Sequence, residues 1–251
     1  MAPRLPKMSV LSAEQLTGRV RSHVLDLPES GCILHPDAAA AFQGLRTAAL
    51  QTDIDLVGVS SFRSFQHQLT IWNDKFHGRR VLLDQDGRPL DAAVMTEQQR
   101  VRAILLWSAL PGASRHHWGT EIDVIDRAAL SPGQRPQLIP LEYSPGGVFE
   151  RLGAWLPRHC ADYGFFLPYD QDRGGVRPEP WHLSFAPVAS RALPALTVDV
   201  LAAALTEVEL AGAAVVHRQL ADIHARYVCA VAQPAAAALA ATRLNPATRP
   251  S

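Results

Sequence analysis

The stretch from Pro111 to Asp123 constrains the fold most, because a polar loop there runs directly into an apolar strand. It reads PGASRHHWGTEID, and the residues that follow are typical of a buried strand. An imidazole nitrogen and a carboxylate oxygen are both ligands for a divalent ion such as zinc. Gly119 would let the backbone turn closely, so that His116 and Asp123 can meet. The same pattern also fits an ordinary polar loop before a capped strand, so this stretch alone leaves both interpretations open.

Two further segments carry related chemistry. Downstream, the run PEPWHLSF places Glu179 three residues before His182, and upstream, the run VSSFRSFQHQ places Arg63 between serines just after apolar residues. In this order, the three segments resemble the VanY-type D-alanyl-D-alanine carboxypeptidases, within the zinc peptidases that include VanX and the LAS enzymes. The residues that match the family's three patterns are Ser60, Arg63, Ser64 and Gln68, then Ser114, His116, Gly119 and Asp123, then Glu179, Trp181 and His182.

The resemblance implies a Zn²⁺ ion held by His116, Asp123 and His182. Two imidazoles and one carboxylate leave a coordination position open, as in catalytic rather than structural zinc sites. Glu179 is the expected proton acceptor for an attacking water. Arg63 could polarise the substrate carbonyl or clasp a substrate carboxylate with its planar fork, and the resemblance favours the first role.

The family also implies the substrate. We expect a zinc metallopeptidase that removes a C-terminal D-alanine from peptidoglycan stem peptides, with Ser114 and Gln68 as substrate-binding residues. An L,D-carboxypeptidase, a peptidoglycan endopeptidase and a DD-dipeptidase are alternatives on the same metal core. A muropeptide-binding protein without catalysis is a further alternative, although the candidate ligands, Glu179 and Arg63 are all present.

Two positions complicate the family pattern. Glu121 stands where the family usually has a small alanine, two residues before Asp123. Residues two apart on a strand share a face, so Glu121 would face either a cationic substrate group or a histidine behind the metal. His117 adjoins His116, and only the family register selects His116 as the ligand.

Composition narrows the class of protein. The 251 residues suffice for one sizeable domain, and 24 basic residues balance 24 acidic ones, which argues against a nucleic-acid partner. The three cysteines are widely spaced and do not indicate a thiolate metal site or a disulfide framework. We find no signal peptide and no run of about 18 apolar residues, so we expect no membrane span. The expected location is the cytoplasm, or the periplasm if a signal is missing from this sequence.

We expect an α+β fold in which a small antiparallel sheet carries the zinc site and helices flank it. The expected units are an N-terminal helical extension (1–35), the catalytic domain (36–190), a helical C-terminal extension (191–233) and a flexible tail (234–251). The C-terminal extension has an apolar stripe that could cap the domain or join two copies into a homodimer. The expected elements are helices over 36–50, 64–76, 96–110 and 147–163, strands over 55–59 and 181–185, a hairpin near Asp86-Gly87, and loops over 128–145.

Overall fold

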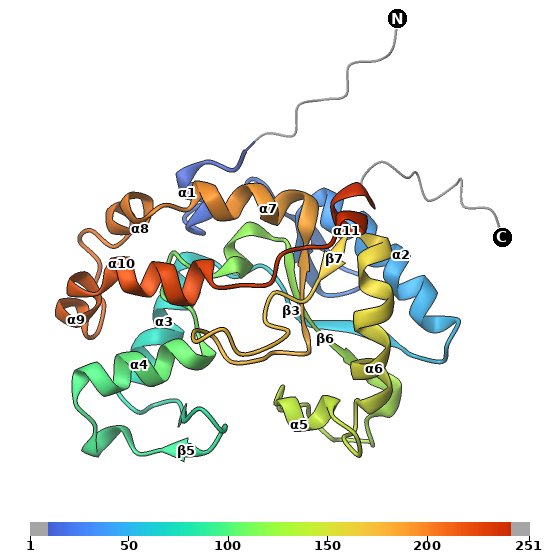
Figure 1. Ribbon diagram of the computed structural model, residues 1–251, viewed down its shortest axis with the longest axis horizontal. Coiled ribbons are helices and arrows are strands. Elements are labelled where there is room, and N and C mark those ends of the chain that lie inside the picture. Colours follow the sequence, from blue (N-terminus) through green and yellow to red (C-terminus); the bar gives the residue numbers. More distant parts are fainter. Residues whose placement is uncertain (1–9, 242–251) are drawn as a thin grey trace, which may run out of the picture.

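A four-stranded antiparallel sheet lies at the centre of the computed structural model, which describes residues 10–241 (Figure 1). Both central strands are buried along their whole length, so they are covered on both faces. The predicted α+β class is therefore confirmed. In order across the sheet, the strands are β3 (Leu56–Ser60), β6 (Glu121–Asp126), β8 (His182–Phe185) and β7 (Phe165–Phe166).

The register of these strands brings the three sequence motifs together. Ser60 at the end of β3 pairs with Asp123 on β6, and Asp123 in turn pairs with His182 on β8. The register shifts between Gly58 and Ser60, and such irregularities often re-aim side chains beside active sites. Directly opposed residues of antiparallel strands lie close on one face. The sheet therefore aligns one residue from each motif in a row.

Helices surround the sheet. Figure 1 shows α2, α6 and α11 on one side of the strands, and α3, α4, α8, α9 and α10 on the other. The α-helices are α1 (Ala13–Leu16), α2 (Pro36–Leu50), α3 (Phe65–Phe76), α4 (Glu97–Trp107), α5 (Pro140–Tyr143), α6 (Glu150–His159), α7 (Ala186–Ala195), α8 (Val198–Ala204), α9 (Ala213–Arg218), α10 (Leu220–Ile223) and α11 (Ala236–Ala240). Short 3-10 helices are η1 (Ala92–Val94), η2 (Arg115–Trp118), η3 (Arg127–Ala129) and η4 (Cys160–Tyr163), and η5 (His224–Cys229) is a π-helix. Two-stranded hairpins pair β1 (Leu25–Leu27) with β2 (Cys32–Leu34), and β4 (Leu82–Leu83) with β5 (Pro89–Leu90).

Local signals explain where the main helices begin. Pro36 at the first position of α2 supplies a suitable backbone angle, and this helix has the predicted bounds. The Ser64 side chain accepts a hydrogen bond from the His67 N–H and so caps α3. Thr96 and Gln99 form a capping box at the start of α4. Helices α3 and α4 then pack their buried faces into one core, in which the largest fully buried side chains include Trp72, Trp118, Phe42, Phe149, Phe165 and Phe185.

The expected N-terminal helical extension is wrong. Ser12 and Gln15 form a capping box, but α1 lasts a single turn and the β1–β2 hairpin follows. Gly18 takes a left-handed backbone angle (φ 72°), and its carbonyl accepts a hydrogen bond from the Phe65 N–H. This contact draws the chain toward the start of α3 and ends the helix. Residues 1–9 lie outside the described residues.

Two other expectations need correction. The 128–145 segment, expected as loop, contains the short helices η3 and α5. Part of the expected tail is the helix α11, where Ala238 is fully buried; residues 242–251 of that tail lie outside the described part. The helix expected over 147–163 begins at Glu150, with α6 running through Pro157 and η4 ending at Tyr163 before Gly164 (φ 82°).

The apolar stripe of the C-terminal extension packs inside the chain. Leu201, Leu205, Val215 and Ile223 are all buried, so the helical extension caps the domain. A homodimer through these helices stays a prediction. Within residues 10–241, no helix taken singly has the length and apolar composition to cross a membrane; only the pair α7 and α8, bent by 81°, meets those criteria together.

Candidate metal centre and substrate cleft

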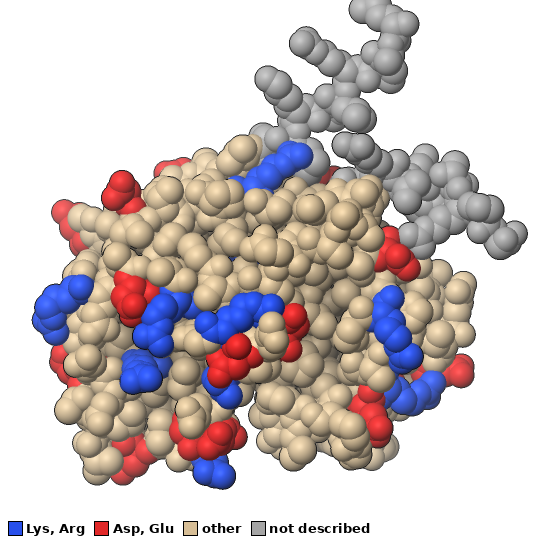
Figure 2. Space-filling view, in the orientation of Figure 1, with Lys and Arg blue, Asp and Glu red and all other residues tan. Residues whose placement is uncertain are grey.

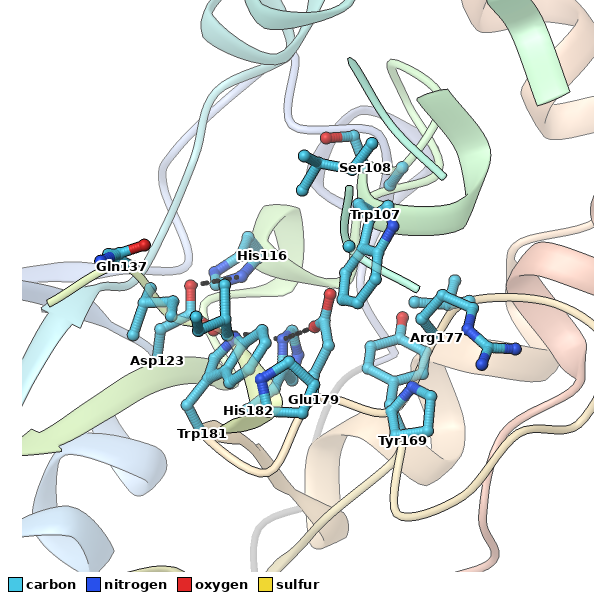
Figure 3. A pocket seen from close by; sticks show the side chains of 18 of the residues that line it. Trp107, Ser108, His116, Asp123, Gln137, Tyr169, Arg177, Glu179, Trp181 and His182 are labelled. Atoms are coloured by element: carbon cyan, nitrogen blue, oxygen red, sulfur yellow. Dashed lines mark ion pairs between the residues drawn. The ribbon is translucent and has the colours of Figure 1, made fainter. Parts of the chain in front are cut away.

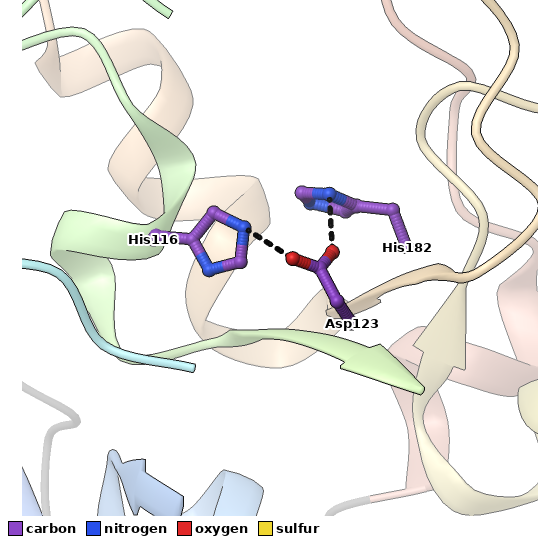
Figure 4. Close-up of side chains that lie close together, drawn as sticks. All are labelled: His116, Asp123 and His182. Atoms are coloured by element: carbon purple, nitrogen blue, oxygen red, sulfur yellow. Dashed lines mark ion pairs between the residues drawn. The ribbon is translucent and has the colours of Figure 1, made fainter. Parts of the chain in front are cut away.

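His116, Asp123 and His182 lie together in the interior, and the atoms that each can offer to a metal ion are within 4.8 Å of one another (Figure 4). Asp123 and His182 are cross-strand partners on β6 and β8. His116 comes from η2, which ends at Gly119. Gly119 has a left-handed backbone (φ 69°), and a Cβ there would meet Val24 at 2.3 Å. The predicted close turn between His116 and Asp123 is thus confirmed.

The geometry of these three side chains suits a metal ion. His116 Nε2 lies 3.4 Å from Asp123 Oδ2, and His182 Nδ1 lies 3.2 Å from Asp123 Oδ1. Ligand atoms around tetrahedral zinc are about 3.3 Å apart when the bonds are about 2.0–2.1 Å. Asp123 Oδ1 is buried and accepts no hydrogen bond. An orphaned carboxylate oxygen between two imidazole nitrogens is what a cation site requires.

The far nitrogen of each candidate imidazole ligand is anchored. His116 Nδ1 lies 2.7 Å from the Ser61 carbonyl oxygen, so it donates there and leaves Nε2 facing Asp123. His182 Nε2 lies 2.7 Å from Glu121 Oε2, which leaves Nδ1 facing Asp123. Such outer partners fix the tautomer and orientation of metal-binding histidines.

Negative charge concentrates around His182. Burial opposes its protonation, but the adjacent carboxylates of Asp123, Glu121 and Glu179 raise the pKa of His182 well above its ordinary value. Burial likewise opposes ionisation of Asp123, yet the neighbouring His116 and His182 hold its pKa at about 2. Three carboxylates therefore lie close together around His182, and a divalent ion bound there would balance their negative charge.

His117, the competing imidazole, is fully occupied elsewhere. Its side chain is completely buried, its Nδ1 lies 2.6 Å from the Arg63 carbonyl oxygen, and its Nε2 accepts the Gly112 N–H at 3.1 Å. The Gly18 backbone packs against its ring. His117 thus contacts three loops of the chain through its ring. Because both of its ring nitrogens are engaged there, His116 is the candidate ligand.

Glu121 lies behind His182 rather than in the cleft. Its Oε1 accepts hydrogen bonds from Thr120 Oγ1 (2.8 Å) and Ser184 Oγ (2.7 Å), and its Oε2 lies 3.4 Å from Arg115 Nε. Burial opposes its ionisation, but the Arg115 charge and the His182 hydrogen bond bring the pKa of Glu121 down to about 2. Of the two roles considered for Glu121, the contacts support the one that holds a histidine.

Glu179 stands on the open side of His182. Its Oε2 lies 3.1 Å from His182 Nδ1, and its N–H donates to the Tyr169 carbonyl oxygen at 2.9 Å. The side chain retains 12% exposure, in contrast to the fully buried Glu121. Burial raises the pKa of Glu179 above its ordinary value. A carboxylate with a raised pKa beside a candidate metal site suits proton transfer.

Arg63 follows the end of β3 and lines the same cleft as Glu179. Its Nη1 donates to Gln68 Oε1 at 2.8 Å and its Nη2 donates to Ser60 Oγ at 3.2 Å. Gln68 is completely buried, and its Nε2 donates to the Ala109 carbonyl oxygen at 2.7 Å. With both ends of its amide engaged, Gln68 orients Arg63, and the predicted direct contact of Gln68 with substrate is not supported by its position.

The candidate metal ligands lie at the floor of a cleft of about 700 Å³ (Figure 3). Figure 2 shows the molecule hollowed between the lobe that carries β5 and the lobe that carries α5. Ser114 lines this cleft, and its side chain does not cap η2; its role in substrate binding stays a prediction. Cleft residues that the motif analysis did not single out include Lys75, Trp107, Ser108, Tyr169 and Arg177.

Similar proteins identify the family. The sequence model of VanY, described as D-alanyl-D-alanine carboxypeptidase, matches residues 31–188. Two proteins of Haemophilus influenzae, both described as uncharacterized, are 36% identical over 121 residues and 42% identical over 103 residues. These matches cover 47% and 40% of this chain, and 92% and 70% of the respective relatives. The solved structure of VanYB in complex with D-alanine-D-alanine has a TM-score of 0.48 and 20% identity, over 74% of this chain and 89% of that one.

The fold and the site define an α+β protein with a candidate catalytic metal centre at the floor of a cleft. The family match spans all three motifs, from the first to the third. This chain belongs to the VanY family of D-alanyl-D-alanine carboxypeptidases.

Proposed function

We propose that the protein is a zinc-dependent carboxypeptidase that removes a C-terminal D-alanine from peptidoglycan stem peptides. The observation that carries this proposal is the placement of Glu179 on the open side of the His116, Asp123 and His182 cluster, 3.1 Å from His182 Nδ1. Membership of the VanY family supports a peptidase, and the D-alanine specificity is the further step of the proposal.

Zinc is the proposed ion, and His116 Nε2, Asp123 and His182 Nδ1 would hold it. When bound there, the ion would supply a Lewis acid and lower the pKa of a water molecule to about 7. Ser61 and Glu121 fix the two imidazoles from behind, so the ligand atoms need little rearrangement to receive the ion.

Glu179 is the proposed proton carrier. It would accept a proton at a carboxylate oxygen as water attacks the peptide carbonyl, and then deliver that proton to the leaving amine. The raised pKa of Glu179, caused by burial, favours the protonated form that this second step needs. The partly exposed carboxylate can meet a substrate that enters through the cleft.

Arg63 is the proposed stabiliser of the oxyanion that forms on the carbonyl oxygen. Gln68 and Ser60 hold its guanidinium from one side, which fixes the plane that it presents to the cleft. A fixed cation stabilises developing charge without reorganising in the transition state. A loosely held substrate anchor would not need these two partners.

The test is mass spectrometry of products from defined stem peptides incubated with the zinc-loaded protein. We expect release of one D-alanine from the pentapeptide and no reaction at internal bonds. Release from the tetrapeptide alone would indicate an L,D-carboxypeptidase, cleavage of the D-alanyl-D-alanine dipeptide a DD-dipeptidase, and internal cleavage an endopeptidase. Any of these three outcomes would replace the proposed specificity.

The metal assignment has its own test. Metal analysis should find about one zinc per chain, the stoichiometry of a single site. The triple variant His116→Ala, Asp123→Ala, His182→Ala should retain almost none, and His117→Ala should retain a full equivalent at temperatures where it remains folded. A full equivalent in the triple variant would move the site elsewhere.

A further inference from the structure

Lys75 faces the same cleft from the last turn of α3. Its Nζ donates a hydrogen bond of 2.6 Å to Ser108 Oγ, and Ser108 is the residue that ends α4. Both residues line the cleft, and Figure 3 shows Ser108 across the cleft from His182. In the part of the chain that the structure describes, no carboxylate forms an ion pair with Lys75. The pair therefore presents a cation with a hydroxyl as its neutral partner.

The surroundings of Lys75 favour an anion. Burial lowers the pKa of Lys75 to about 8, with Glu179 acting to raise it and Arg63 and Arg80 acting to lower it. The side chain remains mostly protonated at pH 7, in a region where other cations repel it. An ammonium that is desolvated and lacks a counter-ion gains strongly from an incoming carboxylate.

The residue type is unusual for this chain. Lys7 and Lys75 are the only lysines among 24 basic side chains, and the others are arginines. An ammonium is a compact point charge that can turn its donors toward one oxygen of a carboxylate, whereas a guanidinium presents a wide planar fork. Among the described residues that line the cleft, Lys75 is thus the one ammonium, beside the guanidinium groups of Arg63, Arg115 and Arg177.

We propose that Lys75 and Ser108 bind the C-terminal carboxylate of the peptide substrate. This inference rests on the proposed function and specifies how an exopeptidase would recognise the end of its substrate. Glu179 is the carboxylate that most favours the charge of Lys75. In the proposed mechanism, Glu179 protonates the leaving amine. The released C-terminal residue and its carboxylate therefore leave on the side of the cleft near Glu179 and Lys75. Arg63 then remains available for the scissile carbonyl.

The first experiment compares a free-acid substrate with its C-terminal amide. With zinc-loaded protein and N-acyl-L-Lys-D-Ala-D-Ala, we expect wild type to prefer the free acid. Lys75→Met should lower kcat/KM for the free acid by about 10- to 100-fold, the usual cost of a charged hydrogen bond, and leave the amide unchanged. Ser108→Ala should act in the same direction but less strongly. Arg80→Met is the matched control, since Arg80 is a nearby cation that does not line the cleft, and it should keep the preference.

Two kinetic outcomes would overturn the inference. An equal loss for both substrates in Lys75→Met would assign Lys75 a general structural role. A severe loss of turnover on both substrates in Ser108→Ala, with the acid-to-amide ratio of the residual activity intact, would point to a serine nucleophile activated by the lysine instead.

A second experiment separates this inference from the proposed function. With ¹³Cε-labelled lysine, the NMR spectrum contains two lysine signals, which Lys75→Met assigns. N-acetyl-D-alanine should raise the pKa of Lys75, and N-acetyl-D-alanine amide should not. Failure of peptide hydrolysis with an intact NMR response would overturn the proposed function and support the carboxylate site. Hydrolysis without any NMR response to the carboxylate would overturn the carboxylate site and support the proposed function.

Discussion

Glu121 shows how one buried residue organises the candidate metal centre. Its carboxylate accepts three hydrogen bonds, from His182, Thr120 and Ser184, and pairs with Arg115 at 3.4 Å. It thereby selects the tautomer of His182 that leaves Nδ1 free for a metal. A small alanine at this position would leave that nitrogen and the Arg115 charge without a carboxylate partner.

Glu121→Gln should therefore weaken zinc binding by about 10- to 100-fold, the usual effect of losing an outer partner of a ligand. The free energy of unfolding should also fall by about 3–5 kcal/mol, because Arg115 loses its buried counter-charge. Competition with a chelator of known affinity, at a temperature where the variant is folded, measures the first effect. Ser184→Ala is the matched control, since it removes the hydroxyl that donates to Glu121 and accepts from Arg115 but keeps the Glu121 charge, and it should change zinc affinity less. Unchanged affinity in Glu121→Gln would limit Glu121 to a structural role.

Glu179 should be needed for peptide hydrolysis but not for zinc binding. Glu179→Ala removes the proposed proton carrier, so hydrolysis should fall by about two to four orders of magnitude while zinc content stays at its wild-type value. Single-turnover kinetics with parallel metal analysis would check both parts. Turnover near that of wild type, with metal intact, would remove Glu179 from the mechanism.

At the scale of elements, the end of β3 delivers Arg63, and the first turn of α3 holds it. Gln68 lies on the buried face of α3 and accepts from Arg63 Nη1 while it donates to the Ala109 carbonyl oxygen. This arrangement makes Gln68 a positioning residue that links α3 and Arg63 to the segment just after α4.

Arg63→Lys should depress kcat with little change in KM, because an ammonium does not reproduce the guanidinium plane at the oxyanion. Gln68→Leu should show the same split to a smaller extent, since Arg63 stays present but loses one of its two partners. Steady-state kinetics on the free-acid substrate separates the two constants. A raised KM with kcat intact in both variants would reassign Arg63 to substrate anchoring.

The elements also show what local sequence determines and what it does not. The helix over Pro36–Leu50 and the capping box of Thr96 and Gln99 follow from neighbouring residues, and both were predictable. The hairpin within the first 35 residues was not, because the contact of Gly18 with the distant Phe65 ends the helix there. The partners of Glu121 were not predictable either. Strand spacing predicts on which face of β6 Glu121 lies, but the contact with Arg115 depends on packing between η2 and the sheet. Lysine is rare in this sequence, which sets Lys75 apart, but only the fold shows that Lys75 faces the cleft.

For the whole molecule, the candidate site depends on contacts between distant parts of the chain. The three motifs span residues 59–185, and the sheet register brings them into one row. The C-terminal extension closes the core behind α3 and α4, where Trp72 Nε1 donates to the Ala211 carbonyl oxygen at 3.0 Å. Helix α11 covers the other end of the sheet, where its Ala238 packs in a small apolar cluster with Phe166, Ala186 and Ala232.

This cluster predicts that α11 stabilises the sheet that carries His182. Ala186 directly follows β8, and Phe166 lies on β7 beside it. Ala238→Asp would place an unpaired charge in the cluster, so either the charge stays buried at a cost or α11 detaches. We expect a loss of about 1–3 kcal/mol in the free energy of unfolding, since detachment limits the penalty. For a chain of this size, that corresponds to a fall in Tm of about 2–4 °C for each kcal/mol.

Ala237→Asp is the matched control, because Ala237 lies in the same helix with its side chain exposed, and its Tm should stay near that of wild type. Thermal unfolding of both variants in zinc-free buffer excludes an indirect effect of metal affinity, and equal Tm values for the two would show that α11 does not support the fold.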